Sequence, residues 1–223
     1  MEKNDMVEID RIERPETLLS LAYEKIKSLL VGGELKQDTI YSANYFAEML
    51  GVSRTPVREA LLQLAAENLL ISVQGRGFRI REFTAKEIRD FFETRLMIET
   101  YVIGHLAEGI GTEDIQALDQ SLGQMLQSAE SKYSYRFLEA DKAFHMNLIH
   151  RYENRLLVSI MENIRNLISI LGRKALAIPG RTGEVVEEHQ RVLNGLKKKD
   201  ARGAAAAMRD HLKTTERYIV ESL

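Results

Sequence analysis

Four residues whose side chains bind metals stand at helical spacing in the second half of the sequence. Asp141 and His145 are four positions apart, so on a helix they point the same way, with Cβ atoms roughly 5–6 Å apart. His189 and His211 fall on the last two helices that the apolar pattern predicts. If the three helices converge, one carboxylate and three imidazoles would form a mixed N/O site for a divalent cation. The alternative is an ordinary solvated pair, because an Asp and a His four apart are common on helix surfaces.

The two remaining histidines are not candidate ligands. His150 is five positions from His145, about 140° around a helix, and cannot share its site. We assign His150 and His105 to the surface or to satisfied core positions.

One arginine interrupts an otherwise apolar helix face ahead of these residues. Arg95 is either a surface residue or an ion-pair partner of Glu99, four residues later, or it reaches into the interior and clamps a carboxylate ligand with two parallel donors. The sequence leaves both interpretations open.

A second chemistry is indicated by basic residues at the start of a short helix near position 54. Thr55 and Pro56 suit an N-cap and a first helical position, since proline lacks a donor that the first turn would leave unpaired. Arg54 and Arg58, four apart, share one face. The opposite face is apolar at Val57, Ala60, Leu61 and Leu64. The basic face is therefore free to contact a partner, although solvated arginines are the alternative.

The segments around this helix predict a winged helix-turn-helix. Residues 42–50 form a second short amphipathic pattern, and Gly51-Val52 is the turn between the two helices. Two β-prone runs, 69–73 and 78–81, flank Gln74-Gly75-Arg76-Gly77 and predict a hairpin with a basic tip. Arg54, Arg58 and Arg76 at the hairpin tip are the candidate DNA contacts.

The helical period and its breaks divide the chain into three parts. Residues 1–16 are charged and lack an apolar period, which indicates a flexible arm. Residues 17–82 form the predicted winged domain, and residues 83–223 form an all-helical domain of about six helices. The predicted fold class is mainly α.

Composition limits the modes of binding and the location. The chain has 223 residues, 44% of them hydrophobic, and a net charge of −2. Because the chain as a whole is nearly neutral, electrostatic attraction to nucleic acid must come from a local basic patch. It has no cysteine, which excludes disulfides and Cys-based zinc sites. The polar start lacks a signal-peptide core, and no apolar run is long enough to span a bilayer. We expect a cytoplasmic protein with no membrane partner.

Two stretches closely resemble the GntR family of transcriptional regulators, in particular its FadR-like subgroup with the all-helical FCD ligand-binding domain. The winged half is similar through residues 52–61, Leu64 and the Gly75-Arg76-Gly77 tip. The helical half is similar through Glu93-x-Arg95-x-x-x-Glu99, Asp141-x-x-Phe144-His145, Glu188-His189 and Met208-Arg209-Asp210-His211-Leu212. The resemblance implies a homodimer on a palindromic DNA operator, with the recognition helix in the major groove and the wing in the minor groove.

The same resemblance implies roles for individual residues. Arg54, Thr55 and Arg58 would contact bases and phosphates, and the backbone around Gly75 would approach the minor groove. Family members commonly carry an Arg early in the second helix, but residues 43–46 here are Ala-Asn-Tyr-Phe. The usual operator bases are therefore not expected.

Resemblance to the metal-containing branch of the subgroup implies which metal and which ligand the helical domain binds. Asp141, His145, His189 and His211 would hold a divalent cation such as zinc or nickel, and a small carboxylic acid would bind against it. With an octahedral metal, two positions would remain for water or a carboxylate, and Arg95 could hold the other end of the acid. The ligand set argues against the long acyl-thioester that the FadR prototype recognises.

These observations predict a ligand-responsive transcriptional repressor rather than an enzyme. A metal-dependent hydrolase is one alternative, but the motif supplies no general base beyond the ligands themselves. An architectural DNA-binding protein without a ligand is the other. The sequence does not name the effector, the operator, the metal or the sign of regulation.

Overall fold

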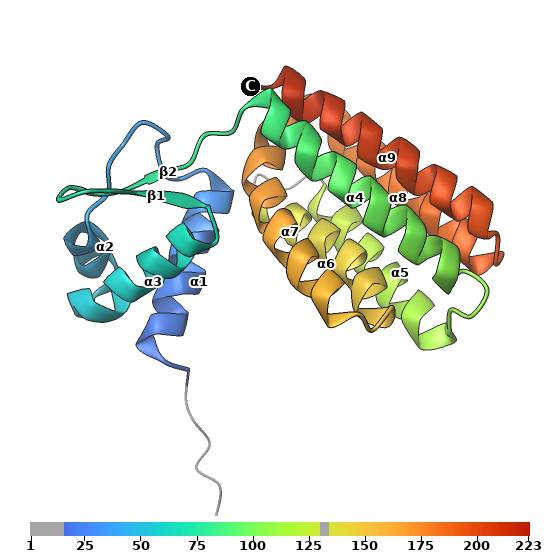
Figure 1. Cartoon of the computed structure of the whole chain (residues 1–223), viewed down its shortest axis with the longest axis horizontal. Helices are drawn as coiled ribbons and strands as arrows, with labels where there is room; N and C mark the ends of the chain where they lie inside the picture. Colours follow the sequence, from blue (N-terminus) through green and yellow to red (C-terminus); the bar gives the residue numbers. More distant parts are fainter. Residues whose placement is uncertain (1–15, 130–133) are drawn as a thin grey trace, which may run out of the picture.

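The computed structural model describes residues 16–129 and 134–223, and within them a small winged unit precedes a larger helical bundle (Figure 1). The winged unit comprises α1 (Leu18–Gly32), α2 (Ala43–Leu50), α3 (Arg54–Ala66), β1 (Leu70–Val73) and β2 (Gly77–Ile80). The bundle comprises α4 (Ala85–Leu106), α5 (Thr112–Ser128), α6 (Ser134–Arg151), α7 (Arg155–Leu176), α8 (Arg181–Lys197) and α9 (Ala201–Glu221). The predicted fold class is confirmed, and the expected arm lies outside the described residues except for Glu16.

The turn between α2 and α3 follows the predicted helix-turn-helix. The Ser42 hydroxyl accepts from the Tyr45 N–H and caps α2, and Gly51 ends the helix in the left-handed region at φ 67°. The predicted start of α3 was wrong by two residues. Ser53 is the N-cap, so Pro56 is the third helical residue rather than the first. Proline is tolerated there because the first turn of a helix has no intrahelical acceptor for its N–H groups.

The wing is an antiparallel hairpin in which Leu70 pairs with Ile80 and Val73 with Gly77. Tyr41 adds one bridge to Phe78, so the loop before α2 is fixed against the wing. Gly77 has φ 135°, and a Cβ there would lie 2.3 Å from the Tyr41 carbonyl oxygen. Glycine is therefore required at this position, and it sets the wing beside the helix-turn-helix.

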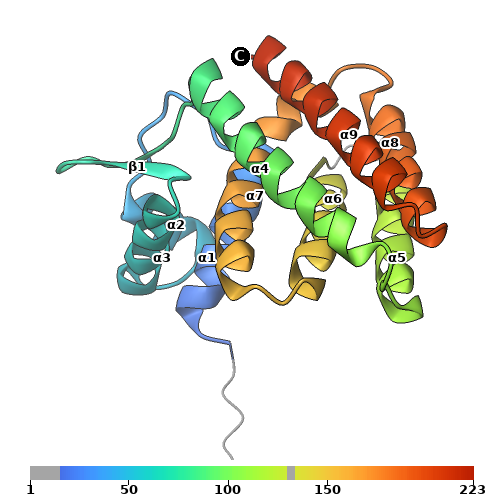
Figure 2. The same cartoon turned by 45° about the vertical axis from the view of Figure 1, so that its right-hand side comes forward.

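The bundle is held together by helices that pack along their apolar faces. α9 lies along α4 and α8, α5 packs on α6, and α6 packs on α7 (Figures 1 and 2). α4 starts at a capping box in which the Thr84 hydroxyl and the Glu87 carboxylate satisfy each other's backbone N–H groups. Fully buried core side chains include Phe92, Ile103, Phe144, Val192 and Met208. Among the described helices, none is long and apolar enough to cross a membrane.

A polar contact joins the winged unit to the bundle. The Asn166 amide on α7 donates to the Glu67 carboxylate at the end of α3, over 3.2 Å. The Tyr23 hydroxyl of α1 donates to the same carboxylate, and the Lys142 ammonium of α6 donates to the Asn166 oxygen over 2.9 Å. Asn166 of α7 therefore touches the end of the helix that precedes the wing, and Lys142 of α6 supports Asn166.

Candidate metal centre and nucleic-acid interface

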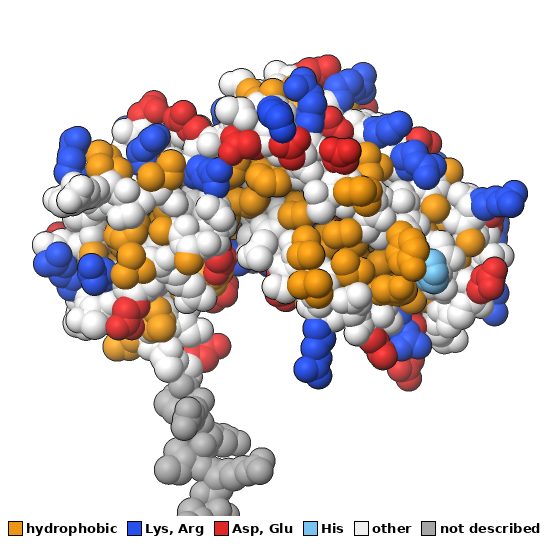
Figure 3. Space-filling model, viewed as in Figure 1, with side chains coloured by type: hydrophobic (Ala, Val, Ile, Leu, Met, Phe, Trp, Pro, Cys, Tyr) orange, Lys and Arg blue, Asp and Glu red, His pale blue; other side chains and the backbone are white. Residues whose placement is uncertain are grey.

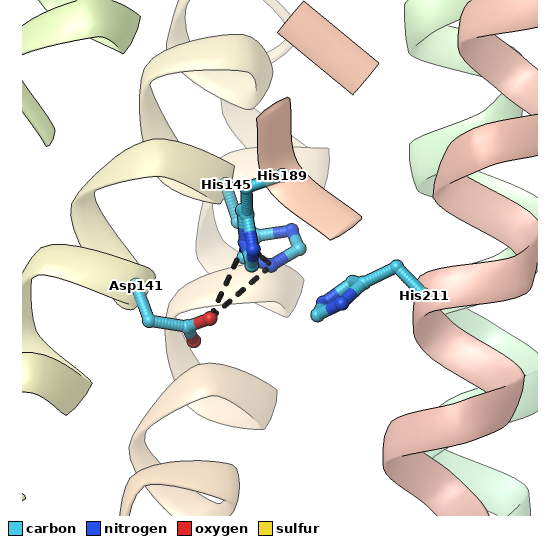
Figure 4. A group of neighbouring side chains, drawn as sticks. All are labelled: Asp141, His145, His189 and His211. Carbon is cyan, nitrogen blue, oxygen red and sulfur yellow. Dashed lines mark hydrogen bonds and ion pairs between the residues drawn. The ribbon is translucent and has the colours of Figure 1, made fainter. Parts of the chain in front are cut away.

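The four predicted metal ligands meet inside the bundle. α6 supplies Asp141 and His145, α8 supplies His189 and α9 supplies His211, and all four are buried. One ligand atom from each lies within 4.8 Å of all the others. Figure 4 shows the side chains pointing toward a common centre from three helices. The convergence that the spacing required is therefore present.

The separations suit a single cation. The His189 Nε2 lies 3.2 Å from the His145 Nε2 and 3.3 Å from the Asp141 Oδ1, while the His145 Nε2 lies 3.9 Å from that oxygen. Zinc binds imidazole nitrogen and carboxylate oxygen at roughly 2.0–2.2 Å, which places neighbouring ligands about 3–3.5 Å apart. A cation at the centre would thus need only small adjustments of these side chains.

Each imidazole is oriented by an acceptor for its Nδ1–H group. The His145 Nδ1 contacts the Glu99 carboxylate, and the His211 Nδ1 lies 2.7 Å from the Glu188 Oε2. The His189 Nδ1 lies 2.8 Å from the Val185 carbonyl oxygen. In all three rings the proton belongs on Nδ1, so the Nε2 lone pair faces the centre. This outer shell is typical of metal-binding histidines.

The inward-facing atoms of these four residues are therefore all acceptors, and the Arg95 Nη2 is a donor 3.3 Å from one of them, the His145 Nε2. Two Nε2 lone pairs and a carboxylate oxygen face one another within 4 Å, with both Nδ1 protons committed elsewhere. Electron-rich atoms repel at such distances unless a positive charge lies between them. A divalent cation at the centre would satisfy all of them at once, so these four residues could hold a metal ion.

Buried arginines neutralise the carboxylates of this cluster. The Arg95 Nε donates to the Glu99 Oε1 over 2.7 Å, and Arg181 donates to both oxygens of Glu188. Arg165 on α7 contacts the Asp141 Oδ2, which leaves the Oδ1 directed at the imidazoles. The cluster is therefore a closed set of paired charges.

Both interpretations of Arg95 find support in its position. It forms the buried ion pair with Glu99, and its Nη2 lies 3.3 Å from the His145 Nε2, beside the metal-binding atoms. Its Nη1 has no hydrogen-bond partner among the described residues although it is buried. A role in effector binding stays a prediction.

Sequence reasoning gave no role to Arg165, Arg181, Glu99 and Glu188 as supports of the ligands, apart from a possible Arg95–Glu99 pair. Glu99 and Glu188 stood in the quoted motifs, and Glu188 directly precedes a ligand. Arg165 had one signal, a charge within the apolar pattern of α7, but its partner Asp141 is 24 residues away. The other two histidines, His105 and His150, are exposed, as expected.

The environment keeps the imidazoles neutral and the carboxylates ionised. Burial lowers the pKa of His211 to about 4, with a further contribution from His189, and burial also lowers the pKa of His189 and, strongly, of His145. Burial raises the pKa of Asp141, but the charge of Arg165 outweighs it and holds that pKa well below its usual range. Neutral imidazole and ionised carboxylate are the forms that bind metal.

The candidate DNA contacts gather around one groove on the winged unit. Arg54, Arg58, Gly75 and Arg76 line a hollow of about 340 Å³ between α3 and the wing. Thr55 is exposed on the first turn of α3 but does not line the hollow. Asn44 of α2, in the segment that lacks the expected Arg, does line it. The basic residues of helix and wing therefore face one space.

Comparisons with known proteins match both halves of the chain. The family model described as bacterial regulatory proteins, gntR family, matches residues 19–80. The FCD domain model matches residues 90–214, more than half of the chain.

Individual relatives agree with these matches. The gluconate operon transcriptional repressor of Bacillus subtilis is 28% identical, over 82% of this chain and 74% of its own length. The solved structure of McbR/YncC from E. coli has the same fold, with a TM-score of 0.80, 22% identity and coverage of 93% and 99%. A solved structure described as the metal-free FCD domain of TM0439 matches with a TM-score of 0.53 and 22% identity, over 64% of this chain and 97% of that one.

The buried histidines predict how the stability of the metal-free protein depends on pH. Their pKa values in the folded state lie below the ordinary 6.5, so above pH 6.5 they are neutral in both states. As the pH falls from 6.5 towards 4, these histidines bind protons in the unfolded chain but stay neutral in the folded chain. Stability is therefore lost, on the order of 3 kcal/mol for His211 alone.

Urea denaturation between pH 7.5 and 4.5, with a chelator present, measures this loss. We expect His211→Gln to flatten the pH dependence and His150→Gln, at an exposed site, to leave it unchanged. Glu188, with a pKa of about 2, contributes only in a separate window below pH 4.5. If the free energy of unfolding fell equally with pH in wild type and His211→Gln, the proposed protonation states would be contradicted.

Proposed function

The chain belongs to the gntR family of bacterial transcriptional regulators and carries an FCD domain, and from this premise we propose that it is a metal-dependent repressor controlled by a small carboxylic acid. The proposal has three parts: operator binding by the winged unit, dimerisation through the bundle, and acid sensing at the metal centre. The matched relatives are regulators and not enzymes, so the metal-hydrolase alternative is set aside.

Operator binding is supported by the groove between α3 and the wing. Arg54 and Arg58 are exposed at the start of α3 and Arg76 at the tip of the wing, so three cationic side chains surround one hollow. With a net charge of −2, the chain has little bulk attraction for DNA, and this local patch must supply the phosphate contacts. Arginine pairs with guanine would add roughly 1–3 kcal/mol of discrimination each.

The metal site is supported above all by the three imidazoles whose Nδ1–H groups are already committed. Zinc or nickel suits a set of three nitrogens and one carboxylate oxygen, and zinc is the better match if the site is tetrahedral. A bound divalent cation would supply a positive centre that accepts a carboxylate oxygen. Asp141, His145, His189 and His211 would hold it, and Arg95 would lie beside it to bind the acid.

Repression is inferred from the gluconate operon repressor, and the small acid from the charge of the site. Binding of the acid must favour one arrangement of the paired winged units over another to change DNA affinity. The architectural alternative predicts instead that no small acid alters DNA affinity.

A homodimer is supported by an exposed apolar patch on the bundle (Figure 3). Met97 and Tyr101 on α4 and Leu156 at the start of α7 are 63%, 52% and 69% exposed. The Tyr101 ring on α4 lies 5.9 Å from the ring of Tyr152, in the turn between α6 and α7, so the patch continues from α4 towards the start of α7. A contiguous apolar surface of this kind marks an interaction site. A second copy is the natural occupant, because a palindromic operator presents two half-sites to two recognition helices.

The first prediction from the proposed function concerns the recognition helix. Arg58→Ala should raise the dissociation constant for the operator about 5- to 150-fold, because one bidentate base contact is worth roughly 1–3 kcal/mol. Gel-shift titration on an operator selected from random DNA measures this change. Arg191→Ala, an exposed arginine on α8, is the matched control and should bind normally. Unchanged affinity with Arg58→Ala would overturn the assignment of α3.

The second prediction concerns the dimer. Tyr101→Glu should shift the protein from dimer to monomer, because it buries a charge in the apolar patch. Leu126→Glu changes an equally exposed apolar residue on α5, outside the patch, and should stay dimeric. Sedimentation velocity distinguishes the two. A Tyr101→Glu protein that remains dimeric would exclude this patch as the interface.

The third prediction concerns the metal. His189→Ala should lose bound divalent metal and, with it, any effect of carboxylic acids on operator affinity, while His150→Ala, at an exposed site on α6, should keep both. Elemental analysis after metal loading and gel filtration gives the stoichiometry, and gel shifts with added acids give the response. Absence of bound metal in the loaded wild type would refute the site. Metal without any acid response would favour the architectural alternative.

A further inference from the structure

Three arginines are buried in the bundle, and they differ in how fully they are paired. Arg95, Arg165 and Arg181 are each at most 1% exposed. Arg181 uses both terminal nitrogens on Glu184, Glu188 and Thr215. Arg95 and Arg165 each keep one buried donor, Nη1 and Nε respectively, without a partner among the described residues.

An unpaired buried donor is costly, so these two need an explanation. A buried N–H without an acceptor forfeits about 1–3 kcal/mol, and more when it carries charge. Arg95 and Arg165 also repel each other, and this repulsion contributes to the lowered pKa of Arg95 after the larger effect of burial. Two cations that line the same cavity and each keep a free donor are suited to bind an anion.

A small cavity lies between these groups. It measures about 30 Å³ and is bounded by Arg95, Arg165, Asp141 and His211 on one side. Most of its other lining is apolar, including Leu138, Ile168, Ala175 and Val185, but Arg181 and Thr215 line it as well. The space is enough for one or two water-sized groups. A carboxylic acid is larger than this space, so a ligand that enters must be short and side chains must move to admit it. We expect Arg165, which lines the cavity and contacts Asp141, to be the one that moves.

The charges of the cluster set the charge of that ligand. The buried charged residues of the bundle are three arginines and three carboxylates, which cancel, together with three neutral histidines. A divalent cation on Asp141 and the imidazoles adds two positive charges to this closed set. Buried net charge is expensive, so the loaded site is neutral only with two further negative charges.

We propose that the effector is a short dianion, a dicarboxylate, with one carboxylate at the metal and the other on the free donors of Arg95 and Arg165. This inference rests on the proposed function and narrows it, since a monocarboxylate would leave one buried positive charge uncompensated. It also gives Arg165 a role in effector recognition that the sequence pattern did not indicate.

The position of Arg165 links this ligand to the winged unit. The next residue, Asn166, donates to Glu67 at the end of α3 and accepts from Lys142, which follows Asp141. A dianion that draws Arg165 away from Asp141 therefore acts on the turn of α7 that carries the contact between the units. Operator affinity is thus a second readout of binding.

The test compares acids of equal length and different charge on the zinc-loaded full chain. Malonate against propionate, and succinate against butyrate, are titrated by isothermal calorimetry, with zinc retention measured after each titration. We expect one dianion per chain, bound at least tenfold more tightly than the matched monoanion, with zinc retained and operator affinity changed.

Each other outcome counts against the proposal. Equal affinity for the two classes, or two monoanions bound per chain, would overturn the dianion while leaving metal-dependent acid sensing intact. Stripping of zinc by the dicarboxylate would show chelation instead of binding. No response to any acid, with zinc bound, would overturn acid sensing as well.

Variants test the assigned donors separately. Arg165→Gln should abolish the preference for the dianion when variant and wild type are compared at equal zinc content, which elemental analysis must check because Arg165 contacts the metal ligand Asp141. Lys174→Gln, exposed on the same helix, should change nothing. Arg165→Lys keeps a positive charge opposite Asp141, so it tests the role of the guanidinium in a protein that is less exposed to a folding defect. Full dianion preference in both Arg165 variants would exclude this residue from the site.

Discussion

The candidate metal centre depends on three hydrogen bonds that the buried imidazoles donate from Nδ1. Glu99, Glu188 and the Val185 carbonyl each take an Nδ1–H, so the Nε2 atoms of His145, His189 and His211 are left as acceptors facing Asp141. Three of the six helices in the described bundle must converge for this geometry to exist, and a fourth, α4, supplies Glu99. The apolar packing of α4 on α9 and of α8 on α9 is what holds those donors and acceptors in register.

Such a cluster is an unusual interior for a helical bundle. Nine charged or titratable side chains are buried where hydrophobic residues of similar volume would commonly be as stable or more so. The pairing of each carboxylate with an arginine limits the penalty, but it does not remove the two free arginine donors or the facing lone pairs. The proposed cation and anion would together satisfy the groups that the protein leaves unsatisfied.

The sequence was informative where contacts are local and less so where they are not. The helix-turn-helix followed from Gly51 and the spacing of Arg54 and Arg58, and the pairing of Asp141 with His145 followed from one helical turn. The meeting of His189 and His211 with them depends on tertiary packing, which periodicity alone does not determine; it was expected only if the helices converged. Arg165 was missed because its partner lies on another helix, and the start of α3 was misplaced because proline is acceptable throughout the first helical turn.

The most direct test of this account is X-ray absorption at the zinc edge of the loaded full chain near neutral pH. We predict a first shell of nitrogen and oxygen at about 2.0–2.2 Å, with the outer-shell scattering of three imidazole rings. In His189→Ala protein, any zinc that remained would show fewer imidazoles. A wild-type spectrum without imidazole scattering, as for zinc held by surface carboxylates and water, would contradict the central claim that the buried cluster is a metal site.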